Sequence, residues 1–232
     1  MPPERVIYLP NGPGIPLLAV SPAERAAERA RLGVGARPTV LVYSRLFEFD
    51  TARLAAVLAG VRAAVPDVAV LLVGAGLYAA DSARFREQLA AAGLLDAVID
   101  VGWVELAVLP ATLAAADVGL YLMDDTLLNR AKCPVKLADM LAAGVPVVAE
   151  AVGQVPEYVR DGRTGVLCVT GDVAGMVAAV VALISKAGVA SAGQESGGRG
   201  AGEMKREAAR ADVVARFGWE GLAAIVEKAY SG

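Results

Sequence analysis

Short apolar runs alternate with helix-like segments through the middle of the chain, and this alternation constrains the fold more than any other feature. The first run, Thr39–Tyr43, is followed by Thr51–Ala64, where leucine and valine recur at helical spacing. Strands that lack polar alternation and are separated by helices indicate a parallel sheet covered on both faces. Further strands are expected at 68–73, 97–101, 118–123, 146–149 and 165–169, and further helices at 82–92, 109–116, 134–143, 155–159 and 173–186. Residues 37–186 are therefore predicted to form an α/β domain, a Rossmann-like doubly wound parallel sheet with helices on both faces.

The segments on either side of this domain differ from it in composition. Residues 1–36 are predicted to form an extended, proline- and glycine-rich lead-in followed by a helix, for which Ser21 is the N-cap. Residues 187–203 are rich in glycine, serine and alanine and predict a flexible linker. Residues 204–232 predict a C-terminal helical segment with a break near Gly218.

The composition excludes several classes of function. The chain contains no histidine, so it cannot hold a Ser-His or Cys-His catalytic dyad or a histidine metal ligand. The formal net charge is −3, and no basic run suggests a nucleic-acid partner. The apolar runs are too short for a membrane span, the first residues do not read as a signal peptide, and two cysteines do not make a disulfide framework. We therefore expect a soluble, cytoplasmic protein.

The most informative polar segment lies between Asp124 and Cys133, directly before the helix expected from Pro134. Open parallel sheets bind ligands at the carboxyl ends of their strands, and a helix N-terminus offers N–H groups to an anion such as a diphosphate. A carboxylate one turn deeper, at Asp139, can accept hydrogen bonds from a ribose diol. The alternative is an ordinary amphipathic helix whose lysine and aspartate are solvated. The predicted diphosphate-binding residues are Arg45, Arg130, Lys132, Val135 and Lys136, with Asp139 as the ribose ligand.

Two further loops at the same edge of the sheet contain candidate base-binding residues. Gly74 and Gly76 lie in a G-x-G-x-x-A sequence after the second strand, and Trp103 and Val104 follow the third. The glycine pattern matches the dinucleotide fingerprint and keeps a nicotinamide-dependent oxidoreductase open as an alternative. In a true fingerprint the helix starts within the motif, whereas the better N-cap candidates here begin at Asp81. No residue is identified as catalytic, and no metal site is expected.

Residues 134–149, PVKLADMLAAGVPVVA, resemble the P-x-K-(L/F)-x-E-x-x-A-x-G-x-P-V-V-A segment of group 1 retaining glycosyltransferases. Residues 153–165, GQVPEYVRDGRTG, are similar to the family's G-x-x-E-x-(I/V)-x-(D/N)-G-x-x-G stretch, and Leu9–Gly12 is similar to the x-P-N-G sequence that joins the two domains of such enzymes. The resemblance implies the donor-binding lobe of a two-domain GT-B enzyme, which binds a nucleotide-diphosphate sugar for transfer with retention. It also implies that no cofactor and no covalent protein nucleophile are used, because the donor's own phosphate assists as base.

The sequence departs from the family at two site positions. Asp50 stands where the family commonly has a lysine, and Arg130 and Lys132 are the candidates to replace that cation. Ala131 stands at the first of two glutamates eight residues apart, the second of which matches Asp139. The acids of the preceding loop are the candidates to supply the missing contact to the donor sugar.

The chain starts where the resemblance places the interdomain linker. The resemblance thus implies a separate acceptor-binding domain or partner chain, without which this chain is expected to be inactive. The alternative is a non-catalytic module that only binds nucleotide sugars.

Overall fold

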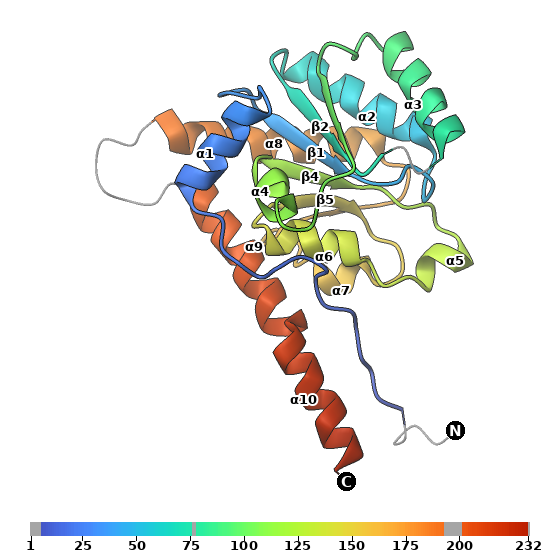
Figure 1. The fold of residues 1–232 in the computed structure, drawn as a ribbon. Coiled ribbons are helices and arrows are strands. Elements are labelled where there is room, and N and C mark those ends of the chain that lie inside the picture. The colour runs from blue at the N-terminus through green and yellow to red at the C-terminus, as the bar shows by residue number, and fades with distance from the viewer. Residues whose placement is uncertain (1–5, 76–77, 193–200, 232) are drawn as a thin grey trace.

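A six-stranded parallel sheet forms the centre of the molecule (Figure 1). The computed structural model describes residues 6–75, 78–192 and 201–231. The order of the strands is β3-β2-β1-β4-β5-β6, so the chain changes its direction of winding between β1 and β4. The predicted fold class, a Rossmann-like doubly wound parallel sheet, is confirmed. Open α/β sheets bind their ligands at the switch point. The strands are β1 (Thr39–Tyr43), β2 (Ala69–Val73), β3 (Val98–Gly102), β4 (Val118–Tyr121), β5 (Val147–Glu150) and β6 (Gly165–Cys168).

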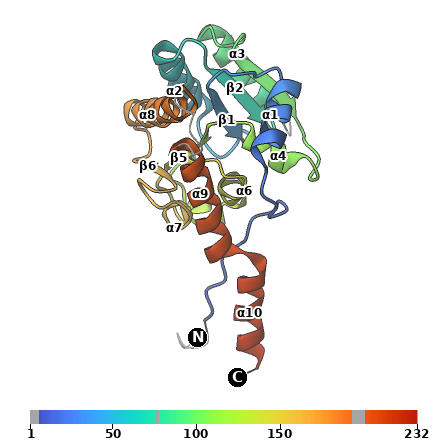
Figure 2. The same cartoon turned by 90° about the vertical axis from the view of Figure 1, so that its left-hand side faces the viewer.

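Helices cover both faces of the sheet (Figure 2). Val40 and Val42 of β1 point to one face, whereas Leu41 points to the other. In Figures 1 and 2, α10 extends away from the body of the domain, and the N-terminal segment leaves the body in the same direction. None of the described helices is both long enough and apolar enough to cross a lipid bilayer. The face of Val40 is covered by α2 (Thr51–Ala64), α3 (Ala79–Ala91) and α8 (Val173–Ala192), and the face of Leu41 by α4 (Leu109–Ala114), α6 (Val135–Ala142), α7 (Val155–Tyr158) and α9 (Ala201–Phe217); the structure also contains α1 (Pro22–Arg31), α5 (Leu127–Arg130) and α10 (Trp219–Tyr230).

Gly119 of β4 allows α6 to approach the sheet closely. A Cβ atom at this position would lie 2.8 Å from Sδ of Met140, a separation that real Cβ atoms do not show. Leu137, Met140 and Leu141 of α6 are fully buried against this face of the sheet. This packing fixes the first turn of α6 beside the carboxyl end of β4, where the sequence placed the candidate site.

The structure corrects several predicted boundaries. Helix α3 begins at Ala79, before the N-caps expected from Asp81, and no side chain caps it. The segment 187–203 is not a linker throughout, because α8 continues to Ala192 and α9 begins at Ala201; residues 193–200 lie outside the described residues. The sequence did not predict α5, which has only four residues. The break near Gly218 is confirmed as the junction of α9 and α10, and the N-cap Ser21 forms a capping box with Glu24.

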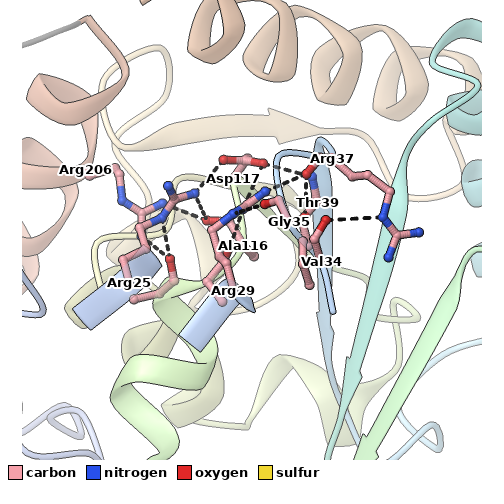
Figure 3. Close-up of polar contacts among 11 residues, drawn as sticks. Arg25, Arg29, Val34, Gly35, Arg37, Thr39, Ala116, Asp117 and Arg206 are labelled. Carbon is pink, nitrogen blue, oxygen red and sulfur yellow. Dashed lines mark hydrogen bonds and ion pairs between the residues drawn. The ribbon is translucent and has the colours of Figure 1, made fainter. Parts of the chain in front are cut away.

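Three arginines bind the C-terminal end of α4 and attach the lead-in helix and α9 to the sheet (Figure 3). The guanidinium groups of Arg25, Arg29 and Arg206 donate to the carbonyls of residues 114–116 over 2.5–3.3 Å. Asp117 completes the cluster, 2.6 Å from Arg25 and 3.5 Å from Arg29. The last carbonyls of a helix have no intrahelical donors, so external cations satisfy them. Helix α1, which the sequence assigned to the lead-in, therefore packs as part of the domain.

The extended lead-in before α1 is also held by side chains of the domain. Tyr158 Oη donates to the Asn11 carbonyl over 2.7 Å, and Trp219 Nε1 donates to the Pro13 carbonyl over 2.8 Å. The Tyr158 ring stacks on Phe217, with the ring centroids 4.1 Å apart. The lead-in is thus fixed to α7 and to the junction of α9 and α10.

Candidate functional site

Three cationic side chains gather at the carboxyl end of the sheet, beside the switch point between β1 and β4. Arg45 follows β1, Lys132 lies in the loop after β4, and Lys136 lies in the first turn of α6. The Lys132 Nζ atom is 5.2 Å from the centroid of the Phe47 ring, and the guanidinium carbon of Arg45 is 6.0 Å from the same centroid. The structure therefore brings three of the predicted diphosphate-binding side chains together. Their contact with a diphosphate itself stays a prediction.

Lys136 is the most unusual of the three cations. Its Nζ atom is buried, has no hydrogen-bond partner among the described residues, and lies 5.3 Å from the centroid of the Tyr43 ring. Burial lowers the pKa of this ammonium from 10.5 to about 8; the charge of Glu48 opposes the shift and that of Arg45 adds to it. A buried ammonium without a partner is unfavourable, and an anion is the group that relieves it.

Polar side chains that the sequence did not single out hold the surrounding loops together. Asn129, which is buried, donates to the carbonyls of Glu48 and Asp124 over 2.8 and 2.9 Å, and so ties the loop after β1 to the loop after β4. Glu150, at the end of β5, is fully buried and lies 2.9 Å from Arg53 of α2. Glu150 also accepts the Met123 amide over 2.7 Å and the Gly171 amide over 2.8 Å. The only sequence signal was a charged residue directly after the apolar run of β5.

Arg130 does not join the cationic cluster, contrary to the prediction. Its Nε and Nη2 atoms donate to the two carboxylate oxygens of Asp125, over 2.5 and 2.7 Å, and its side chain is 59% exposed. The short helix α5 directs Arg130 toward this acid. Asp124 is also paired, 2.8 Å from Arg53, and the sugar contact proposed from the sequence for these two acids stays a prediction. The Val135 amide, expected to be free for an anion, donates to the Cys133 carbonyl over 2.9 Å.

Asp139 is buried, with 3% of its surface exposed, and it points toward the lead-in. Its Oδ1 atom accepts the Gly14 amide over 2.6 Å and the Ile15 amide over 3.2 Å. Burial raises the pKa of this carboxyl from 3.8 to about 6, and the two amide hydrogen bonds oppose that shift. The expectation of a carboxylate free to face a ribose is wrong in this respect, and so is the alternative of a solvated helix face. A ribose contact by Asp139 stays a prediction.

We predict that Asp139→Asn makes the protein more stable at pH 8, whereas Asp139→Ala makes it less stable than Asp139→Asn. The pKa of the folded protein is raised, so the stability due to this group is complete below pH 3.8 and is lost as the pH rises through about 6. Above that pH the buried charge costs about 2–3 kcal/mol, which asparagine removes while it still accepts an amide. Alanine leaves the Gly14 and Ile15 amides without an acceptor, at about 1–3 kcal/mol.

Urea denaturation at pH 5 and pH 8 checks this prediction. The difference between Asp139→Asn and the unchanged protein should shrink at the lower pH, where the wild-type carboxyl takes up its proton. If Asp139→Asn and Asp139→Ala lower the free energy of unfolding equally at pH 8, the ionised carboxylate stabilises the fold and the prediction is wrong.

The loops after β2 and β3 contain the candidate base-binding residues. Gly74 has a positive φ of 78°, and an added Cβ would lie 3.5 Å from the Tyr43 ring. Trp103 is 77% exposed and Val104 is half-buried. Gly76 lies outside the described residues. Helix α3 begins at Ala79, the last position of the glycine fingerprint, and not after the N-caps predicted from Asp81. The helix therefore does start within the motif.

The fold and the site define a class of protein: a Rossmann-like domain with cations at its switch point, an arrangement typical of domains that bind phosphorylated ligands. Residues 37–186 match the model of the family described as glycosyl transferases group 1, and the chain belongs to this family. Membership of this family removes the nicotinamide-dependent oxidoreductase as an alternative.

Relatives and solved structures agree with this assignment. The chain is 33% identical to a GDP-mannose-dependent alpha-(1-6)-phosphatidylinositol monomannoside mannosyltransferase of Mycolicibacterium smegmatis, over 77% of this chain and 47% of the relative. It is 32% identical to a D-inositol 3-phosphate glycosyltransferase of Geodermatophilus obscurus, over 99% of this chain and 51% of the relative. The crystal structure of Anabaena HepE in complex with UDP and glucose has the same fold, with a TM-score of 0.76 at 23% identity, over 97% of this chain and 56% of that one. The chain thus spans about half the length of the curated relatives that it matches.

Proposed function

We propose that this chain is the donor-binding lobe of a GT-B sugar transferase and that it binds a nucleoside diphosphate sugar through the diphosphate. The observation that carries the proposal is the buried ammonium of Lys136, which has no hydrogen-bond partner among the described residues and has Arg45 and Lys132 near it at the switch point. Two phosphates would supply negative charge to pair with these three cations. Cations beside the diphosphate also stabilise it as a leaving group while its charge develops. Because Nζ is enclosed in this structure, the contact requires the flexible lysine side chain to turn outward.

The relatives support the choice of ligand class. One similar enzyme is described as GDP-mannose-dependent, and the structure of HepE contains UDP. We infer a nucleoside diphosphate sugar as donor and transfer with retention. The chain lacks histidine, which agrees with a reaction in which the donor's phosphate, rather than a protein side chain, assists as base.

The acceptor is proposed to come from a separate domain or chain. Such a partner would cover apolar side chains that are exposed in this structure, on the N-terminal segment and on α10. These are Val6, Ile7, Tyr8 and Leu9, and on α10 Trp219, Ile225 and Tyr230. Exposed apolar clusters of this kind mark interaction surfaces. On this proposal the isolated chain has no acceptor site and does not transfer the sugar.

A second candidate is a module that binds nucleotide sugars without catalysis, and one observation favours it. Asp50 occupies the position of a lysine common in the family, and its Oδ1 atom accepts the Ala52 amide over 2.9 Å as the N-cap of α2. The acid is therefore used to start a helix, and a negative charge stands where the family has a cation. Transfer measured with an acceptor lobe present separates the two candidates.

We predict that UDP and GDP bind far more tightly than uridine and guanosine, and that Lys136→Met reduces the difference. A charge-assisted contact contributes about 1.5–3 kcal/mol, so the variant should weaken diphosphate binding by roughly 10- to 100-fold. Arg130→Gln is the matched control, because Arg130 is bound to Asp125 and should leave affinity nearly unchanged. Isothermal titration calorimetry measures both. Equal affinity for uridine and UDP would refute the proposed function.

The pH dependence gives a second readout of the same prediction. The Lys136 ammonium loses its proton around pH 8 in the unbound domain, so the affinity for UDP should fall as the pH rises from about 7 to about 9. Lys136→Met should remove this fall. It should also raise the melting temperature at pH 7, because methionine replaces an ammonium that burial destabilises.

A further inference from the structure

The apolar ring of Phe47 lies close to two of the site's cations. Its ring is 43% exposed, yet Lys132 Nζ lies 5.2 Å from the ring centroid and the Arg45 guanidinium carbon lies 6.0 Å from it. Neither cation forms an ion pair with any described residue. The aromatic face of Phe47 is thus the group that both cations share, and such a face attracts cations electrostatically.

The backbone around Phe47 is held in an unusual conformation that fixes where the ring lies. Among the described residues, Leu46 is the only one other than glycine that has a positive φ, at 65°. Its amide donates to Ser44 Oγ over 3.0 Å, and its side chain is almost fully buried. L-residues adopt this conformation only when their surroundings enforce it, and such residues cluster at functional sites. The turn from Ser44 to Phe47 therefore presents Arg45 and Phe47 together at the end of β1.

A second aromatic residue packs against the ring of Phe47. Tyr78, directly before α3, packs against Phe47 edge to face, with the centroids 5.9 Å apart and the ring planes at 77°. This contact joins the loop after β1 to the segment directly before α3. Long cationic side chains lose much rotamer freedom when a ligand fixes them, and prior positioning reduces that loss.

We propose that Phe47 is a positioning residue, which holds Arg45 and Lys132 at the mouth of the donor site before the diphosphate arrives. The inference rests on the proposed function, because it assumes that the cations bind a diphosphate. In this role Phe47 acts through its aromatic face alone, because its side chain has no charge and no hydrogen-bonding group. Arg45 and Lys132 then meet the phosphates from a restricted set of conformations.

The test compares Phe47→Leu with Phe47→Trp by calorimetry, using UDP, GDP and uridine as probes. Leucine keeps the apolar volume and loses the aromatic face, so UDP and GDP should bind about three- to tenfold more weakly while uridine is unchanged. Tryptophan has the stronger aromatic face and should restore the affinity of the unchanged protein. In a background with Arg45→Gln and Lys132→Gln, Phe47→Leu should have no further effect on UDP.

The outcomes separate this inference from the proposed function. If the unchanged protein does not bind UDP, both are refuted. If it binds UDP and Phe47→Leu binds UDP equally well, only the role of Phe47 is refuted. Equal weakening of uridine and UDP would also overturn it, since the ring would then contact the nucleoside directly. Circular dichroism of both variants shows whether the fold is kept, and the tryptophan variant keeps the test decisive if leucine disturbs it.

Discussion

The isolated 232-residue chain is expected to bind a nucleoside diphosphate sugar and to leave the sugar untransferred. Group transfer depends on holding two reactants in one geometry, which contributes about 7–11 kcal/mol when fully realised. In the proposed function the second reactant is held by another domain or chain. Without it, the bound diphosphate faces water, where dielectric screening weakens the contacts of Arg45 and Lys132. We expect the rate of transfer to be lower by at least about 10⁵-fold, with slow hydrolysis of the donor as the residual reaction.

The assay uses the purified chain with several UDP- and GDP-sugars and with lipid, sugar and phenolic acceptors. The same mixtures are then repeated with an acceptor-binding lobe supplied as a second polypeptide. Transfer that appears only with the second polypeptide supports the proposal that this chain binds the donor and another domain or chain binds the acceptor. Robust transfer by the chain alone would show that it contains its own acceptor site.

Arg29→Ala is expected to destabilise the fold by about 3–5 kcal/mol, a large part of the stability of a domain this size. Arg29 is 8% exposed and donates to the carbonyls of Gly35, Ala115 and Arg37 over 2.9, 2.5 and 2.6 Å. Alanine leaves the Gly35 and Ala115 carbonyls without this donor and leaves the Arg37 carbonyl with the Thr39 hydroxyl alone. It also removes one of the two cations beside Asp117. Arg29→Lys should restore little, because an ammonium cannot reach three carbonyls with the fork geometry of a guanidinium.

The measurement is the free energy of unfolding in urea, with Arg84→Ala as control. Arg84 pairs with Asp81 on the surface of α3, and its side chain is 60% exposed, so its loss should leave the midpoint nearly unchanged. Similar midpoints for Arg29→Ala and Arg84→Ala would mean that water replaces the lost hydrogen bonds at the end of α4 without a penalty.

The fold could be predicted from the sequence because each strand and long helix carries its own local signal. The run Thr39–Tyr43 is apolar throughout, and in Thr51–Ala64 the buried positions recur at helical spacing; both elements have the predicted bounds. Helix α5 carries no such signal, because four residues after the Thr126 cap are too few to show a period. The N-terminus of α3 was misplaced because the observed N-cap, Tyr78, uses no capping side chain.

The site was harder to predict than the fold, because the direction of a side chain depends on distant partners. Arg45, Lys132 and Lys136 could be identified since they follow strands that meet at one edge of the sheet. The environment of Asp139 could not, since its partner amides lie 125 and 124 residues earlier in the chain. The pairing of Arg130 with an acid of its own loop depends on a helix that the sequence did not reveal.

The arginine cluster at the end of α4 also sets a lower limit on the length of chain that keeps its full stability. Two of its guanidinium groups come before residue 37 and the third comes after residue 186, outside the family match on both sides. A fragment trimmed to residues 37–186 would lose all three donors at once, although every strand of the sheet would remain. Asp117, whose Oδ2 atom accepts the Thr39 amide at the start of β1, would lose both of its cations. Segments near opposite ends of the chain therefore meet at one helix terminus, and a fragment for expression has to run at least from Ser21 to Phe217.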